Sequence, residues 1–515
     1  METVTFWLNI VKVALGLGFV IFLHELGHFL LAKWNGVKVE KFSIGFGRTL
    51  LGFKRGETEY VLAAIPLGGF VKMLGEGPED QANKSTDPRA YPNKSVGARM
   101  AIISAGVIMN LLLGLACFVY AYGTGMEETP AKVGMVKAGS PAYEAGLKPG
   151  DEIVGIDDRN NVNFDHLMLK VRLSSTGQQV HFDIKRPGRK DLISLAIEPR
   201  REATADMPSI GITPDYSLTL ATPPYETPAG TTEPLAKNPA GVLKGGETLV
   251  ALGPVGTTPV KVADAEDYHR LLARWADKSL TFVFEAGPGK SAGKSAQARR
   301  IEVTLPPNHF VDFGLRLDME PIVSIQRGSP AEQAGFRKGD KIVKVDDRDD
   351  FDPMRLPSRC YEYAGKEMTF EVERPEAGRD QTKIVTLKVT PDDSPAWTEP
   401  ILPHEPLEVP GLGLAYHVMT HVASVVPDSP ADKAGLKKGD TINAMTFLPP
   451  PEDKKGKGRA KPEQFEFGEE SPDWPSAFDV LQVLPRQAVE LTVNHSNKPI
   501  TITPAVLDPN WHFPL

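Results

Sequence analysis

The chain has 515 residues and a formal net charge of −8. Its length predicts several domains, and the net negative charge gives no indication that the protein binds nucleic acid. Two long apolar runs lie in the first 125 residues and none follows them. We therefore expect a membrane part at the N-terminus and polar domains after it.

The first apolar run extends from about Val4 to Leu31, long enough to span a membrane. A signal peptide is the competing interpretation, but Glu2 precedes the run without a Lys or Arg, and no small-residue cleavage site is present. Near its end lies His24-Glu25-Leu26-Gly27-His28, an H-E-x-x-H pattern. Histidines at i and i+4 share one helix face and can bind one zinc ion. Glu25 beside them is the candidate general base.

The alternative is a pair of core histidines beside a salt-bridged glutamate. Charged side chains in a membrane helix cost about 2.5–3.5 kcal/mol each even on the lower insertion scale. A buried cation and a reacting water would explain why three ionisable groups occur here, and this favours the metal site.

The connection 33–99 contains two apolar stretches that are too short to span. Phe42–Gly47 predicts a Gly-punctuated strand, and Tyr60–Leu74 predicts a strand interrupted at Pro66 and Gly68-Gly69. One possibility is a hairpin that dips into the membrane edge beside the zinc site and offers an open edge to an extended substrate. The other is a small soluble hairpin.

The second apolar run, Met100–Tyr122, predicts a second spanning helix. Gly106 and Gly114 would permit close helix packing. Asn110 lies near mid-membrane and should face protein, where an interhelical hydrogen bond is expected rather than direct catalysis.

Charge predicts the topology. No Lys or Arg precedes Val4, whereas the connection holds eleven: Lys33, Lys38, Lys41, Arg48, Lys54, Arg55, Lys72, Lys84, Arg89, Lys94 and Arg99. The positive-inside rule places this connection in the cytoplasm, the metal site toward the cytoplasmic face, and everything after Gly125 outside. Cys117 and Cys360 lie in different domains, so no disulfide is expected between them.

The remaining chain contains an internal repeat at a spacing of roughly a hundred residues. Its clear copies begin at Ser140, Ser329 and Ser429 with Ser-Pro-Ala, and Asn238–Glu247 is a worn copy. In each clear copy Ser-Pro predicts the start of a short helix and Gly its end. Gly-Asp then predicts a turn into an apolar strand. Gly287–Ser295 is not a phosphate-binding loop, because the glycine spacing is wrong, and Pro449–Pro472 is predicted to be a disordered loop.

This repeat resembles bacterial PDZ domains, which hold peptide ends or extended strands. The resemblance predicts PDZ-like domains at 127–205, 206–306, 307–392 and 401–509 after a membrane part at 1–126. Candidate peptide-edge strands contain Gly211, Gly314 and Gly413; the sequence does not tell whether the first closes one domain or opens the next. The alternative is a set of β-rich modules that only space or pack.

The first 125 residues resemble the site-2 protease family of intramembrane zinc metallopeptidases. The matching segments are His24–His28, Phe42–Gly47, Ile65–Glu76, and Ala105-Gly106 with Asn110. The resemblance implies His24 and His28 as zinc ligands, Glu25 as base, and cleavage of a membrane-anchored protein, for example an anti-sigma factor, in a bacterial inner membrane.

Two features depart from the family pattern. Gly106-Val107 stands where the family usually has Gly-Pro, and the family's third ligand, an Asp in a later membrane helix, has no counterpart after Gly125. A fragment, a ligand supplied by another polypeptide, or an inactive protein would each explain this, and a fragment is the favoured explanation because zinc with two protein ligands is uncommon.

The predicted fold is thus an α-helical membrane domain, with two spanning helices and a membrane-associated β-hairpin, followed by four α+β PDZ-like domains. The predicted function is a multi-pass, Zn²⁺-dependent intramembrane endopeptidase whose PDZ-like array gates or senses substrate. The alternative is a membrane-anchored scaffold that binds peptides without proteolysis.

Overall fold

The computed structural model describes residues 2–76, 86–125, 128–201, 207–220, 243, 245–286, 299–376, 381–398, 400–448, 463–468, 474–483, 488–496 and 498–514. The chain forms two compact units, Met1–Glu127 and Glu128–Leu515. Most of the worn repeat copy at 238–247, the turn at 287–295 and most of the loop at 449–472 lie outside the described residues.

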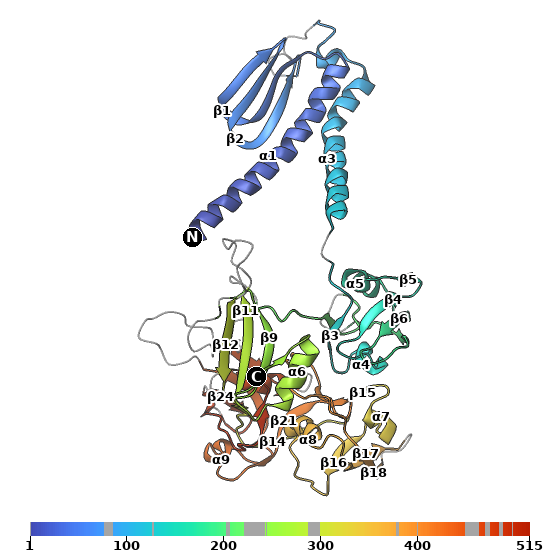
Figure 1. Cartoon of the computed structure of the whole chain (residues 1–515), viewed down its shortest axis with the longest axis vertical. Coiled ribbons are helices and arrows are strands. Elements are labelled where there is room, and N and C mark those ends of the chain that lie inside the picture. Colours follow the sequence, from blue (N-terminus) through green and yellow to red (C-terminus); the bar gives the residue numbers. More distant parts are fainter. Residues whose placement is uncertain are drawn as a thin grey trace. The chain divides into compact units, whose positions relative to one another are not determined.

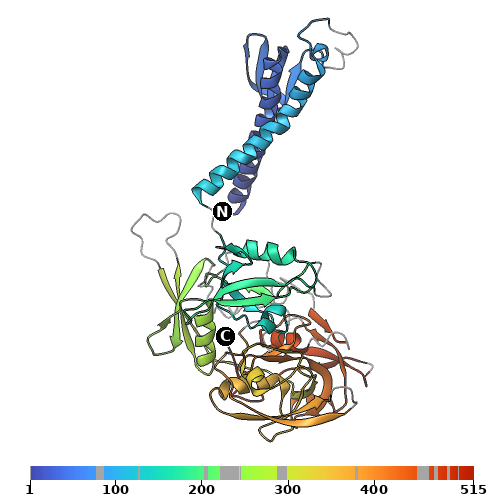
Figure 2. The same ribbon diagram turned by 90° about the vertical axis from the view of Figure 1, so that its right-hand side faces the viewer.

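Two long helices, α1 (Glu2–Trp34) and α3 (Val96–Thr124), lie side by side in the first unit (Figures 1 and 2). Both Trp7–Trp34 and Val96–Thr124 are long and apolar enough to cross a membrane. Many of their apolar side chains are exposed, among them Val13, Leu15, Phe19, Ile103, Leu111, Leu115 and Phe118. Exposed apolar surface of this extent is expected of helices that face lipid.

Small residues set the contact between these helices. A Cβ atom on Gly27 would lie 2.5 Å from the carbonyl oxygen of Ala105, so only glycine permits this approach. Gly106 is equally enclosed, as expected from the sequence. Within the described residues Gly114 makes no close helix contact of the kind expected from the sequence, because no atom lies within 4 Å of a Cβ built there.

The two strands between the helices, β1 (Val39–Arg55) and β2 (Thr58–Met73), form more than a simple hairpin. Phe42 lies opposite both Val71 and Tyr60, and Ile44 opposite both Gly69 and Leu62. Each strand therefore bends into two arms, and the hairpin becomes a sheet of four arms (Figure 1). Among the residues that the structure describes, the arm Gly69–Met73 pairs only with the Val39–Ile44 arm, and its second edge has no strand partner there.

The sheet has a buried and an exposed apolar part. Phe42 packs against Phe29 of α1 with ring centroids 5.1 Å apart, in a core shared with Val39, Val71 and Ile102. Further along the arms, large apolar side chains are exposed: Phe46, Leu50, Leu51, Phe53 and Ile65. After β2 the chain passes through the 3-10 helix η1 (Tyr91–Asn93), and the Ser95 side chain caps α3.

The second unit contains the repeats. The first repeat consists of β3 (Val133–Val136), α4 (Pro141–Ala145), β4 (Glu152–Ile156), β5 (Arg159–Asn160), α5 (Phe164–Arg172), β6 (Val180–Lys185), β7 (Ile193–Ile197) and β8 (Ile212–Pro214). The second has β9 (Glu247–Pro254), β10 (Val260–Lys261), α6 (Ala265–Arg274), β11 (Leu280–Ala286) and β12 (Arg299–Leu305).

The remaining elements follow in chain order. They are β13 (Asn308–His309), β14 (Leu315–Met319), β15 (Ser324–Ile325), α7 (Pro330–Ala334), β16 (Lys341–Val345), η3 (Pro353–Arg355), α8 (Leu356–Glu362), β17 (Met368–Pro375), β18 (Thr382–Val389), β19 (Leu407–Val409) and β20 (Leu414–Tyr416). Then come β21 (Val418–Val425), α9 (Pro430–Lys433), β22 (Ile442–Phe447), β23 (Glu463–Glu466), α10 (Trp474–Val483), β24 (Val489–Val493), β25 (Ile500–Ile502) and β26 (His512–Phe513).

The predicted helix starts are confirmed in the three clear copies, and the predicted helix end at a glycine is confirmed in two of them, since α9 has Ala434 as its C-cap. The side chains of Ser140, Ser329 and Ser429 each accept a hydrogen bond from the backbone N–H three residues later, and a proline follows each serine. Gly146 and Gly335 end their helices in the left-handed conformation, with φ of +84° and +87°.

The Gly-Asp turn is held by a buried ion pair in two copies. Arg186 donates two hydrogen bonds of 2.7 Å to the fully buried carboxylate of Asp151, and Arg374 does the same to Asp340. Each arginine also donates to the carbonyl oxygen of the helix-ending glycine, Gly146 or Gly335, at 2.8 Å. Turn, helix end and strand are thereby fixed together.

Strand pairing corrects the expected domain boundaries. The strand after Gly211, β8, pairs with β3 and closes the first repeat, so the boundary at 205/206 falls too early. The strand after Gly413, β20, pairs with β15 and closes the third repeat, beyond the expected end at 392. The strand after Gly314, β14, pairs with β21 of the fourth repeat, although it precedes the third in the chain.

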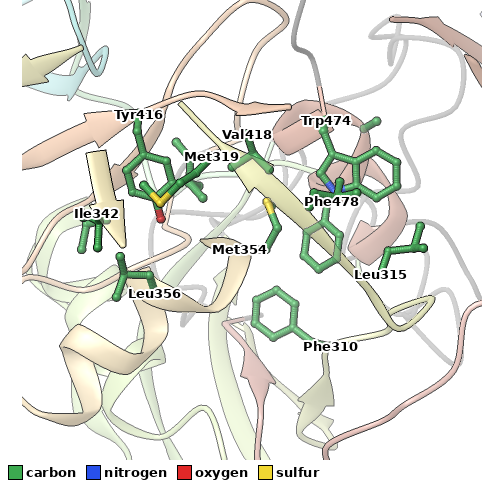
Figure 3. Packing of buried hydrophobic residues seen from close by; sticks show 14 of the residues in the cluster. Phe310, Leu315, Met319, Ile342, Met354, Leu356, Tyr416, Val418, Trp474 and Phe478 are labelled. Carbon is green, nitrogen blue, oxygen red and sulfur yellow. The ribbon is translucent and has the colours of Figure 1, made fainter. Parts of the chain in front are cut away.

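The third repeat is therefore inserted into the fourth. The fourth begins with Asn308–Met319, is interrupted by the third, and resumes at Val418; β13 pairs with β26 near the far end of the chain. Both repeats contribute to one hydrophobic core. Figure 3 shows Ile342, Leu356 and Tyr416 of the third repeat in the same core region as Leu315, Trp474 and Phe478 of the fourth.

Candidate metal centre and peptide-binding strands

The two histidines of α1 converge on one point. The Nε2 atoms of His24 and His28 lie 3.2 Å apart, and both side chains are half-buried against α3. Two nitrogen ligands of a tetrahedral zinc ion, each about 2.0–2.1 Å from the metal, are separated by about 3.3 Å. The spacing of the two Nε2 atoms therefore suits two ligands of one zinc ion.

Helix α3 supplies the groups that orient these rings. The Nδ1 atom of His28 donates a hydrogen bond of 2.6 Å to the carbonyl oxygen of Ile102, so its Nε2 atom carries a lone pair. The Nδ1 atom of His24 lies 3.1 Å from the side-chain amide of Asn110. The interhelical hydrogen bond expected of Asn110 is thus confirmed, and its partner is a predicted zinc ligand.

The amide of Asn110 provides a test of whether the site fits a cation. Its Nδ2 atom faces His24, while its Oδ1 atom is buried without a hydrogen-bond partner. A half-turn of the amide would place Oδ1 on the Nδ1–H of His24 and leave the His24 Nε2 lone pair for a metal. The same turn would satisfy the orphaned oxygen, so both histidines can offer an Nε2 lone pair to one zinc ion.

Gly106 forms the floor of the site. A Cβ atom there would lie 2.5 Å from the Nε2 atoms of both His24 and His28. The sequence indicated only a helix-packing role for Gly106, because its position opposite both rings depends on how α1 and α3 meet.

Two carboxylates lie near the histidines. The Cγ atom of Glu25 lies 3.0 Å from a Cβ built on Gly69, so the candidate base borders the edge arm Gly69–Met73 of the sheet. Burial raises the pKa of Glu76, and the negative charge of Glu25 raises it further. Glu76 was part of a matching segment, but the sequence indicated no role for it.

A third ligand is not found among the residues that the structure describes. No group of three His, Cys, Asp or Glu side chains in those ranges could hold one metal ion. Cys117 and Cys360 are both free thiols.

Comparison with known proteins identifies the family. The model of "Peptidase family M50" matches residues 12–425, which include the H-E-x-x-H helix, the sheet, α3 and most of the repeats. The chain belongs to peptidase family M50.

Several curated relatives are similar to this chain over shorter stretches than the family model. A Clostridium acetobutylicum protein named as a zinc metalloprotease is 41% identical over 210 residues, which cover 40% of this chain and 59% of the relative. The regulator of sigma-E protease RseP of Escherichia coli is 37% identical over 220 residues, covering 41% and 48%. The chain therefore spans about half the length of these curated relatives.

A solved structure is also similar, a PDZ domain protein from Parabacteroides distasonis. The matched region covers 71% of this chain and 91% of the chain in that structure, with a TM-score of 0.14 and 10% identity. That similarity is too weak to carry an argument.

The three predicted peptide-edge glycines occupy equivalent places in the M50 repeats. Gly211, Gly314 and Gly413 have φ of +77°, +85° and +71°, and each stands directly over the helix-capping serine of its repeat. The carbonyl of each preceding residue accepts from the alanine of the Ser-Pro-Ala sequence, at 3.0, 2.8 and 2.9 Å. The three strands that follow, β8, β14 and β20, are therefore counterparts.

These counterparts differ in what lies on their second edge. Within the described ranges β8 and β14 each have one strand partner. In contrast, β20 lies between two strands, β15 and β19. The strand after Gly413 is thus not the open edge that the sequence analysis expected.

Proposed function

We propose that this chain carries the catalytic histidines and base of a zinc-dependent intramembrane endopeptidase. The observation that carries the proposal is the convergence of two Nε2 atoms, 3.2 Å apart, over Gly106 in a membrane-length helix. The proposal is supported by relatives that are named as zinc metalloproteases.

Each residue has a separate task. His24 and His28 would hold the zinc ion through Nε2, while Asn110 and the Ile102 carbonyl keep the rings oriented. When bound, zinc polarises a peptide carbonyl and lowers the pKa of water. Glu25 accepts the proton of the attacking water and passes it to the leaving amine.

The sheet supports the substrate class that we propose. The Gly69–Met73 arm borders Glu25 and has no second strand partner within β1 and β2, both of which the structure describes throughout. An extended segment of a membrane-anchored protein, for example an anti-sigma factor, adds to this edge and so passes the base. The exposed side chains of Leu50, Leu51 and Phe53 support a sheet that enters the membrane edge rather than a soluble hairpin.

The topology is part of the same proposal. The eleven Lys and Arg residues of the 33–99 segment support an orientation in which the sheet and the site lie at the cytoplasmic face of a bacterial inner membrane. The repeats act as an extracytoplasmic PDZ-like array that binds peptide ends or extended strands and gates or senses substrate. In intact cells, a cysteine placed at Thr86 should be protected from an impermeant reagent. A cysteine placed at Ile384 should be labelled by it. The opposite pattern would reverse the proposed orientation.

The test is a charge-neutral change of the base. Glu25→Gln should leave zinc content unchanged and reduce cleavage of a single-span substrate at least a thousandfold, whereas His24→Ala or His28→Ala should lose both. Glu59→Gln, which changes an exposed glutamate of strand β2, is the matched control. Substantial cleavage by the Glu25→Gln protein refutes the assignment.

A second candidate is a membrane-anchored scaffold that binds peptides without proteolysis. The observation that favours it is that the described residues supply two zinc ligands and no third. Purified chain that binds zinc with low affinity and cleaves nothing, while its repeats bind peptides, would support the scaffold.

A further inference from the structure

The third repeat contains a strand, β19, that has no counterpart in the described parts of the other repeats. Strand β19 pairs with β20 in the register Leu407–Tyr416, Glu408–Ala415 and Val409–Leu414. It belongs to the segment 390–411, which joins β18 to the loop around Gly413. In the first and fourth repeats the corresponding edges of β8 and β14 have no strand partner among the described residues.

Strand β19 fills the position of an added peptide. It contacts β20 on one side and the helix α8 on the other. A peptide that adds to a sheet edge gains main-chain hydrogen bonds and places alternate side chains in pockets. Leu407 and Val409 are such alternate side chains, and they are only 2% and 0% exposed in the core.

The loop that would hold the end of a peptide is also filled. The carbonyl oxygen of Val409 accepts hydrogen bonds from the backbone N–H groups of Leu412 at 3.0 Å and Gly413 at 2.9 Å. Backbone N–H groups of this kind can receive a peptide carboxylate. The strand therefore satisfies both the edge and the loop.

We propose that Leu407–Val409 is a built-in ligand that closes the peptide-binding edge of the third repeat. When β19 leaves, the edge between β20 and α8 binds extended peptides with apolar residues at alternate positions. This inference rests on the proposed peptide-binding role of the repeats, and it identifies which repeat is closed and what closes it.

Release of the strand also affects the first repeat. Glu408, between the two buried apolar residues, lies next to the hydroxyl group of Tyr143. Lys137 pairs with Glu405 at 3.4 Å, and Gln326 donates to the carbonyl of Leu147 at 3.3 Å. Since β19 is one of the contacts between the first and third repeats, a peptide at β20 competes with this docking.

A reversible lock tests the proposal in the full chain in detergent. Glu408 and Ala415 lie opposite each other, and opposite Cα atoms of antiparallel strands, about 4.5–5.5 Å apart, can be joined by a disulfide. The variant carries Glu408→Cys, Ala415→Cys and Cys117→Ala. Cys360 stays, because burial raises the pKa of its thiol and makes it unreactive.

The probe is a fluorescent peptide with the sequence of residues 404–409 and a free carboxylate. We expect the reduced protein to bind it at least tenfold more tightly than the oxidised protein. Leu407→Ser with Val409→Ser, which releases the strand without a disulfide, should bind at least tenfold more tightly than the unaltered chain. A peptide with Asp at both apolar positions and the exposed-site variant Ile384→Ser are the controls.

Two results overturn the proposal. One is equal binding by the oxidised and reduced proteins. The other is no gain in binding by a released variant whose near-ultraviolet circular dichroism shows native packing. Glu25→Gln in the same background separates this proposal from the protease assignment. Peptide binding by the third repeat does not depend on Glu25, so it stays unchanged even if the protease assignment fails.

Discussion

The hydrogen bond between Asn110 and His24 should control the affinity of the site for zinc. Asn110→Leu keeps the volume of the side chain and removes the acceptor that Nδ1–H of His24 needs when Nε2 binds metal. An unsatisfied buried N–H costs about 1–3 kcal/mol, which corresponds to a loss of about 5- to 150-fold in affinity. Loss of a hydrogen bond to a metal-binding histidine is typically worth about 10- to 100-fold, so the two figures agree.

The assay is competition for Zn²⁺ or Co²⁺ between the purified chain in detergent and a chromophoric chelator. Asn110→Asp, which keeps an acceptor oxygen, should lose less affinity than Asn110→Leu. Leu111→Ala, at a neighbouring position that is 73% exposed, should match the unaltered chain. Equal metal affinity of the Asn110→Leu and unaltered proteins would show that Asn110 does not orient His24.

Three further outcomes are expected. Gly106→Ala places a methyl group against both Nε2 atoms and should abolish zinc binding, measured as bound metal per chain, whereas Gly114→Ala should not. Asp340→Asn leaves Arg374 without its buried partner and should lower the free energy of unfolding of the second unit by about 3 kcal/mol in urea titration, while exposed Asp349→Asn should change it by less than about 0.5 kcal/mol. Burial raises the pKa of Glu408 from 4.5 to about 7, so the folded chain holds a proton that the unfolded chain has lost in this range. The stabilisation from this proton is therefore fully present below pH 4.5. The free energy of unfolding declines by at most about 3 kcal/mol as the pH rises to 7, and a Glu408→Gln chain should not show that decline.

Features carried by local sequence were predicted well. The i, i+4 spacing of His24 and His28 is sufficient to place both rings on one face, because helix geometry alone determines it. The Ser-Pro and Gly signals of the repeats act within a single turn, and the caps at Ser140, Ser329 and Ser429 form as expected.

Features that depend on partners distant in the sequence were not predicted. The closing strands look alike in sequence, and nothing local tells that Gly314 belongs to the repeat that contains Ser429 rather than Ser329. The double pairing of Phe42 arises because β1 and β2 both bend, which periodicity does not reveal. The place of Gly106 under the two rings follows from the packing of α3 on α1.

The insertion of the third repeat into the fourth delays the folding of the fourth during synthesis. Leu315 pairs with Val425, so β14 leaves the ribosome 110 residues before its partner, 425 minus 315. At about 5–20 residues per second this takes roughly 5–20 s, a period in which Leu315, Leu317 and Met319 have no β21 to cover them. An apolar strand that stays unpaired for seconds is prone to aggregate. Production of this chain should therefore depend on chaperones that hold extended segments. That dependence should be weaker for a variant in which the two repeats follow each other in the chain.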